Sequence, residues 1–295
     1  MAAGVGSGER IHAAIAASAR AGEPDRYLAA LLAAPSARAD LLALAAFAAE
    51  LARVGTVVRR EPAMAELRWQ WWREAVALPA TAQTGHPIAD RLRALIEPRG
   101  VARGVARAVA REDLMGLVDA HAGALGPLPF ATDAGLDRYL TGSEGAMFAL
   151  SARILGLTGN GYAPTWSASA GRAYGLARLL FGLKASVARG QCPIPRARLA
   201  DFGLTPEALP AASSAARARL IADLVRQARD SLARARADAT KLPRQASIAV
   251  LPLALVESYL RASERAEAEP PQRLPHVAPL TRLLRIAGAH WFGRW

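Results

Sequence analysis

The sequence predicts an all-α protein that folds as a single large helical bundle. Apolar residues recur at three- and four-residue steps in segment after segment, and strand-like alternation is nearly absent. Long stretches of Ala, Leu and Arg also have high intrinsic helix propensity. With 295 residues, of which 52% are hydrophobic and 21% charged, the chain can bury a sizeable core and is not expected to be disordered.

Apolar stripes and turn residues place the helices in chain order. In 37–58 the stripe includes Leu44, Phe47 and Leu51, and in 164–187 it includes Leu176 and Leu180. Stretches that contain Pro or Gly separate the periodic runs, at 34–36, 60–62, 126–129, 159–161 and 193–195. The expected helices are 8–20, 24–34, 37–59, 62–77, 87–98, 102–122, 133–156, 165–189, 212–238, 244–267 and 278–291.

Two of these helices, at 143–156 and 165–183, are apolar on more than one face, which indicates buried central helices. Gly171, Gly175, Gly182 and Ser186 share one face of the second. Small residues on a buried face either let another helix pack closely or leave room for a ligand, and we favour close packing.

The connections are short and no low-complexity linker divides the chain. We therefore expect one helical domain over 1–270, with Pro270-Pro271 setting apart a C-terminal basic amphipathic segment at 271–295. In that segment Leu280, Leu283, Leu284, Ala287 and Trp291 form one stripe, with the arginines elsewhere. It is predicted either to lie in an anionic membrane surface or to fold back on the bundle.

The net charge of +12 comes almost wholly from arginine, since only Lys184 and Lys241 are lysines. The sequence has no zinc-finger spacing, no basic strand with interleaved aromatics and no long basic block, so we expect no nucleic-acid partner. One cysteine excludes a disulfide scaffold. No apolar run reaches the roughly 18 residues of a membrane span, and no secretory signal is evident, so a cytoplasmic location is expected.

Motifs of catalysis are scarce. The five histidines are scattered, and the GxSxG, Walker A and GxGxxG patterns are absent. Asp133 and Asp137 have a spacing that suits a metal, but Thr132 or Asp133 at a helix start is better explained as a cap. Cys192 lacks a recognisable base and is predicted to be a packed loop cysteine. We expect no catalytic residue, no metal ligand and no cofactor.

The densest aromatic stretch is LRWQWWREAV at 67–76. On a helix Trp69 and Trp72 lie on one side. They either dock the helix on the core or, together with Arg73, form an interaction or ligand site; docking is the simpler interpretation.

The order of these motifs along the chain resembles that in the squalene/phytoene synthase family. The resemblance runs over about 25–260, through PSARADLLALAAFAAELARVGTVV, LRWQWWREAV, YLTGSEGAMFALSARILG, GRAYGLARLLFGLKASVARGQCPIPRARLADFGL and LPLALVESYL. It implies a helical bundle of the isoprenoid-synthase type. The family's enzymes hold Mg²⁺ between two helices that each present a pair of Asp residues, and the metal neutralises the leaving diphosphate.

The positions that match those Asp pairs are uncharged here. They fall on Ala52 and Thr56 in the first helix and on Gly182 and Ser186 in the second, with the cations Arg53, Arg178 and Lys184 beside them. Such a face is not expected to hold Mg²⁺, because it offers no carboxylate and the cations repel the ion. Together these seven residues are the candidate ligand-binding positions.

The segment from Ala46 to Val54 and the Gln70-Trp71-Trp72-Arg73 run are similar to the family's non-catalytic branch, which includes the mitochondrial complex I assembly factor and its bacterial relatives. The resemblance implies a pseudoenzyme that assists maturation of an NADH:quinone oxidoreductase, with a complex I subunit or assembly intermediate as partner, peripheral at the inner membrane. Two alternatives stay open: a transferase that uses a prenyl diphosphate, and a carrier of an isoprenoid lipid or quinone.

Overall fold

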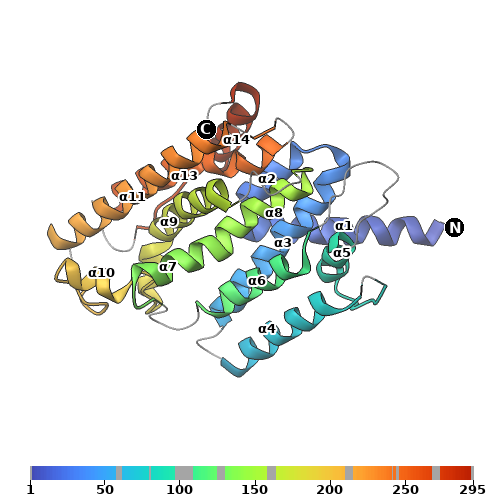
Figure 1. Ribbon diagram of the computed structural model, residues 1–295, viewed down its shortest axis with the longest axis horizontal. Coiled ribbons are helices and arrows are strands. Elements are labelled where there is room, and N and C mark those ends of the chain that lie inside the picture. The colour runs from blue at the N-terminus through green and yellow to red at the C-terminus, as the bar shows by residue number, and fades with distance from the viewer. Residues whose placement is uncertain are drawn as a thin grey trace. The chain divides into compact units, whose positions relative to one another are not determined.

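The computed structural model describes residues 2–57, 62–79, 81–96, 109–124, 130–157, 164–209, 215–240, 242–243, 246–267 and 273–293. Across these ranges the regular structure is helical, with no strand, as the sequence predicts (Figure 1). In the same ranges no helix is both long enough and apolar enough to cross a membrane.

The chain forms two compact units that are interleaved along the sequence. The first comprises Met1–Ala122, Met147–Tyr162 and Leu242–Leu251, and the second comprises Gly123–Ala146, Ala163–Lys241 and Pro252–Trp295. Each unit is described by itself.

The first unit is built around one long helix. This is α3, which contacts α1, α2, α4, α5 and α6. Its apolar face packs inward, with Leu44, Phe47 and Leu51 almost wholly buried. The helices of this unit are α1 (Ala2–Gly22), α2 (Pro24–Leu31), α3 (Pro35–Val57), α4 (Pro62–Ala77), α5 (Pro87–Ile96), α6 (Arg111–Ala122), α8 (Ala146–Ile154, whose first residue lies in the second unit) and α12 (Ser247–Val250).

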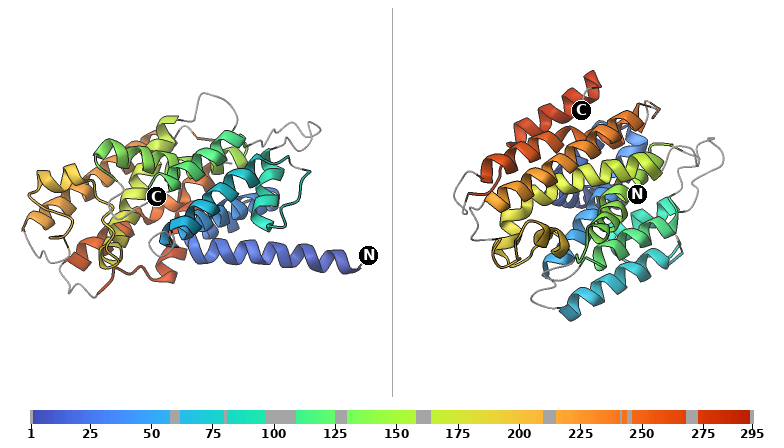
Figure 2. Two further views of the ribbon diagram at one scale, coloured as in Figure 1. Left: turned by 90° about the horizontal axis from the view of Figure 1, so that it is seen from below. Right: turned by 60° about the vertical axis from the view of Figure 1, so that its left-hand side comes forward.

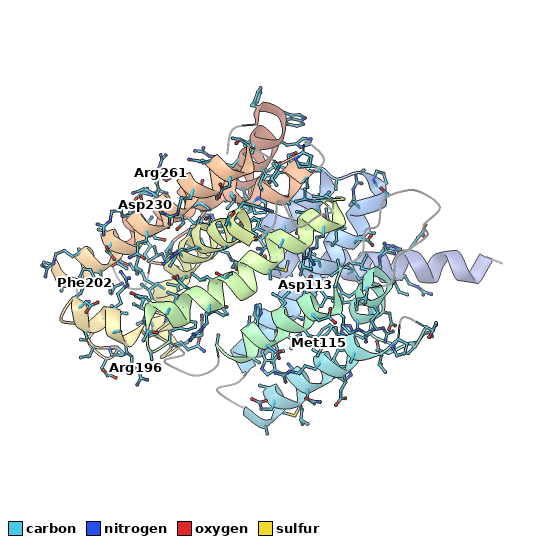
Figure 3. The ribbon with its side chains drawn as sticks, viewed as in Figure 1. Asp113, Met115, Arg196, Phe202, Asp230 and Arg261 are labelled. Carbon is cyan, nitrogen blue, oxygen red and sulfur yellow. The ribbon has the colours of Figure 1, made fainter. Side chains whose placement is uncertain are left out.

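Ion pairs link the helices of the first unit. Asp40 on α3 accepts a hydrogen bond from Arg91 on α5. Asp113 at the start of α6, labelled in Figure 3, pairs with Arg153 on α8. Asp40 is buried, and a charged group inside a core is tolerated only when it is paired. The Arg153–Asp113 pair is more than a third exposed and contributes little to stability.

The second unit is centred on α9, which contacts α11, α13 and the π-helical segment η2 (Figure 1). Arg229 on α11 bonds both Glu257 and Glu264 on α13, each at 3.1 Å, and so fixes those two helices together. The elements are α7 (Asp133–Leu140), η2 (Thr141–Gly145), α9 (Pro164–Ala188), α10 (Arg196–Asp201), α11 (Ala215–Ala239), η4 (Leu251–Leu255, mostly in this unit), α13 (Val256–Glu267) and α14 (Pro279–Phe292).

The glycines on α9 allow close contact between helix backbones. A Cβ at Gly171 would lie 2.3 Å from the backbone nitrogen of Gly145 on η2, and one at Gly175 would lie 2.6 Å from Cδ2 of Leu140. Close packing is therefore confirmed at these two positions. It does not extend to Gly182, where a Cβ would meet no atom within 4 Å.

The helix predictions are mostly confirmed, with four corrections. The helix expected at 133–156 is interrupted by the π-helical η2. The helix expected at 102–122 begins at Arg111; 102–108 lie outside the described residues, and 109–110 are not helical. The helix expected over 244–267 is interrupted by the 3-10 turn η4, because Pro252 has no N–H to continue the α-helical ladder. The short helix α10 was not predicted; Figure 3 labels Arg196 at its start and Phe202 just beyond its end.

Candidate functional site

The first motif face lies on the C-terminal half of α3. Leu51 and Val54 point into the core of the first unit, which leaves Ala52 and Arg53 exposed on the opposite side. The third motif position, Thr56, lies within the helix, but its side chain is outside the described residues. This face of α3 presents a methyl group and a guanidinium where the family's enzymes present carboxylates.

Arg53 is held by its own helix. Its guanidinium donates to Glu50 at 2.6 Å, one turn earlier, and Glu50 also accepts a hydrogen bond from Ser18 on α1 at 3.4 Å. The Arg53 side chain is half-exposed, so the pair contributes little to stability. It does partly neutralise the cation that was predicted to stand beside the first motif.

The second motif face lies on α9. Gly182 faces open space, and Ser186 one turn later is half-buried, with its hydroxyl 3.4 Å from the guanidinium of Arg189. Neither residue carries a carboxylate. A Cβ at Gly182 would meet no atom within 4 Å, so a methyl group would fit there without displacing a neighbour.

Arg178 stands one turn before Gly182 and is bound within the second unit. It donates to Glu144 of η2 at 3.3 Å, and its guanidinium carbon lies 5.5 Å from the ring centre of Tyr174. Sequence reasoning missed Glu144 as a member of this site. The only signal was its place between two glycines in the TGSEG segment, which the structure shows to be π-helical, a geometry often found at functional sites.

Lys184 also has a structural partner. Its ammonium donates to the backbone carbonyl of Ala266 in the last turn of α13. A cation is favourable there because the carbonyl groups at a helix C-terminus are unpaired and carry partial negative charge. On the same side of α9, the ring of Phe181 lies 4.8 Å from that of Tyr259.

These residues do not fit Mg²⁺. The ion needs near-octahedral oxygen ligands that include carboxylates, and the two faces supply a methyl group, a hydrogen atom and hydroxyl groups. The acids that contact the cations beside these faces, Glu50 and Glu144, are each paired with an arginine. Across the described ranges, no group of three or more His, Cys, Asp or Glu residues is placed to hold a metal ion.

The acidic pair on α7 serves the helix and its neighbours. Thr132 is the N-cap, as predicted, and its hydroxyl accepts the Gly135 N–H at 3.3 Å. Asp133 pairs with Arg198, and Asp137 pairs with Arg172 at 2.8 Å. Burial raises the pKa of Asp137, and the nearby Arg172 opposes that rise.

Cys192 is buried in the loop before α10, where its Sγ lies 3.9 Å from the carbonyl oxygen of Ile194. Burial raises the pKa of its thiol, so the reactive thiolate is disfavoured. This agrees with the prediction of a packed loop cysteine.

The tryptophans of α4 divide between core and surface. Trp69 and Trp72 are buried in the first unit, and Trp72 packs edge-on against Phe47 with ring centres 4.8 Å apart. The rings of His86 and Trp71 both adjoin Trp72, and their own centres lie 5.1 Å apart. Burial lowers the pKa of His86, and the charges of Glu50 and Asp90 partly offset this effect. Docking on the core is therefore what Trp69 and Trp72 do in the first unit.

The surface that α4 leaves open is an apolar stripe that sequence reasoning did not single out. Its members recur at steps of three, four and seven, which places three of them on one side of α4 and the fourth in line with them just after the helix ends at Ala77. They are Met64, Leu67, Trp71 and Leu78, all of them exposed. Arg73, the third predicted interaction residue, is partly exposed and bonds Asp119 on α6 at 2.8 Å.

The helical architecture is that of the isoprenoid-synthase fold. A family model described as squalene/phytoene synthase matches residues 19–282, so the chain belongs to the squalene/phytoene synthase family. Two solved structures have the same fold. Squalene synthase HpnC from Alicyclobacillus acidocaldarius is 18% identical, with a TM-score of 0.70 over 88% of this chain and 95% of that one.

A dehydrosqualene synthase solved in complex with a ligand is 11% identical, with a TM-score of 0.73 over 96% of each chain. At these identities the likeness concerns the fold alone. No curated protein sequence matches the chain.

Proposed function

We propose that this protein is a binding member of the squalene/phytoene synthase family that does not carry out Mg²⁺-dependent prenyl transfer. The observation that carries the proposal is the loss of every motif carboxylate, at Ala52 and Thr56 on α3 and at Gly182 and Ser186 on α9. Departure of a diphosphate needs its charge to be neutralised, and these faces offer no ligand set for the metal that would do so.

A metal-free transferase that grips the diphosphate with cations is the less favoured function. Arg53 is paired with Glu50, Arg178 with Glu144, and Lys184 with a backbone carbonyl. Each cation would have to leave its partner before it met a phosphate. Guanidinium also gives weaker electrophilic assistance to ionisation than Mg²⁺ does.

The partner we propose is a subunit or assembly intermediate of an NADH:quinone oxidoreductase. The sequence segments that resemble the family's non-catalytic branch are 46–54 and 70–73. They lie on α3 and α4, and the exposed apolar stripe follows α4 through Met64, Leu67 and Trp71 to Leu78, just beyond its end. An exposed stripe of this kind is typical of a protein-interaction surface.

Turnover tests the absence of catalysis. The purified protein is incubated with farnesyl or geranylgeranyl diphosphate, with and without Mg²⁺, and released diphosphate and hydrocarbon product are measured. We expect neither above the level of a protein-free control. Mg²⁺-dependent release would refute the proposal, and metal-free release would favour the cation-gripping transferase.

Disruption of the exposed apolar stripe along α4 tests the proposed partner. In a strain that lacks the native gene, the amount of assembled NADH:quinone oxidoreductase is measured after complementation with wild type, Leu67→Glu or Ile11→Glu. Leu67 and Ile11 are aliphatic side chains of equal size and both are exposed, but Ile11 lies on α1 and is not part of the stripe. We expect failure with Leu67→Glu and rescue with Ile11→Glu. Full assembly without the gene would refute the role.

A second candidate function is carriage of an isoprenoid lipid or quinone, favoured by the open space at Gly182. Organic extraction of the purified protein followed by mass spectrometry should then release such a lipid. Gly182→Leu should reduce its amount, whereas an extract without isoprenoid would remove this candidate.

A further inference from the structure

The C-terminal helix α14 has two apolar faces, and only one of them is covered in the second unit. Ile286 and Ala289 are buried, and the guanidinium of Arg282 lies 5.7 Å from the ring centre of Tyr259 on α13. The contact of Arg282 with Tyr259 connects α14 to α13 of the same unit; Figure 2 draws the two helices in red and orange. The helix therefore folds back on the bundle, which was one of the two outcomes predicted from the sequence.

The other face of α14 remains uncovered. At 100° per residue, Leu280, Leu284 and Trp291 fall within a narrow sector, Leu283 flanks them, and the sector lies well over 90° away from Ile286 and Ala289. Leu280, Leu284 and Trp291 are 64%, 62% and 70% exposed. A helix whose anchoring is already provided by one face has no folding reason to keep large apolar side chains on the other.

The charges around this stripe have one sign. Residues 273–293 contain Arg273, Arg282 and Arg285 and no acidic residue. Arg285 is exposed at the border between the two faces. Phe292 is 76% exposed beside Trp291, and the helix ends immediately after it, at Gly293 with a φ of 63°.

We propose that the exposed stripe of α14, made of Leu280, Leu283, Leu284 and Trp291, docks the protein on an anionic lipid surface. Leucines on one side, exposed arginine at the border and aromatic rings at the helix end are the pattern of a helix that lies in the headgroup layer. The charge pattern argues against a second copy of this chain as the occupant, because two copies would bring like-charged segments together, and 273–293 contains no acidic residue to pair with the partner's arginines. The inference goes beyond the proposed function and does not depend on it.

Vesicle flotation of the full-length protein tests this proposal. Vesicles of phosphatidylcholine alone are compared with vesicles that also contain phosphatidylglycerol, at low and high salt. The variant is Leu280→Glu combined with Leu284→Glu, and Ile11→Glu on α1 is the matched control, since all three side chains are exposed and their loss opens no cavity. Thermal unfolding of each variant verifies that the fold is intact.

We expect wild type and Ile11→Glu to float with the anionic vesicles only, and salt to weaken the binding. The double variant should bind about a hundredfold more weakly, because each leucine lost from the lipid contributes on the order of tenfold. The proposal is overturned if wild type does not bind, if the double variant binds as well as wild type, or if binding ignores lipid charge. A dimer in solution that the double variant abolishes would overturn it in favour of a second copy. None of these measurements involves catalysis or the partner of α4. A negative result would therefore refute lipid docking and leave the proposed function unaffected.

Discussion

The close contact between α9 and η2 predicts opposite effects on stability when two glycines of α9 are replaced by alanine. In Gly171→Ala the new Cβ would lie 2.3 Å from the nitrogen and 2.5 Å from Cα of Gly145, whereas ordinary contacts begin near 3.4 Å. Both clashing atoms belong to the backbone, so the two elements must separate by about 1 Å. Overpacking of this kind costs about 1–3 kcal/mol, and the better helix propensity of alanine returns up to about 1 kcal/mol.

Gly182→Ala is the matched control. Its Cβ would meet nothing within 4 Å, so only the propensity gain of about 0.5–1 kcal/mol remains. We expect Gly171→Ala to lower the free energy of unfolding by about 1–2 kcal/mol and Gly182→Ala to raise it. Urea unfolding followed by far-UV circular dichroism measures both. If Gly171→Ala were as stable as wild type, the close backbone contact inferred here would be refuted.

Three further predictions concern single residues. Because burial lowers the pKa of His86, the folded state binds fewer protons there than the unfolded state. Stability should therefore fall as the pH drops through about 6.5, and it should fall less steeply in His86→Gln. Melting temperatures at several pH values measure both. Thr132→Ala removes the N-cap of α7 and should cost about 1 kcal/mol in urea unfolding, whereas an unchanged midpoint would contradict the capping role. Cys192 should react with iodoacetamide far more slowly than a free thiol, because it is buried and its pKa is raised; a rate equal to that of a cysteine peptide would argue against this.

Most of the fold could be predicted because the chain is locally consistent. Helix propensity, apolar periodicity and Pro or Gly punctuation agree for α3, α4, α9 and α11, whose predicted bounds lie within a few residues of those observed. The short helix α10 escaped notice because six residues carry too little periodicity. The π-helical η2 was hidden because its sequence continues a helical pattern, and only the backbone shows the wider turn.

The site was less predictable than the fold. The sequence showed which positions lack carboxylates, but it did not show what the neighbouring cations contact. The pairing of Arg178 with Glu144 depends on η2 packing against α9, and that of Lys184 depends on the end of α13. On α4, spacing placed Trp69 and Trp72 together and favoured their docking on the core, which the structure shows, but it did not single out the exposed Trp71.

Binding of a divalent ion tests the central claim most directly. Mn²⁺ takes the place of Mg²⁺ and is titrated into the protein together with farnesyl thiodiphosphate, a substrate analogue that ionises poorly, while electron paramagnetic resonance counts the free ion. Without carboxylates at Ala52, Thr56, Gly182 and Ser186, we expect the protein to remove no more Mn²⁺ from solution than the analogue alone. Tight, saturable Mn²⁺ binding that requires both protein and analogue would contradict the account.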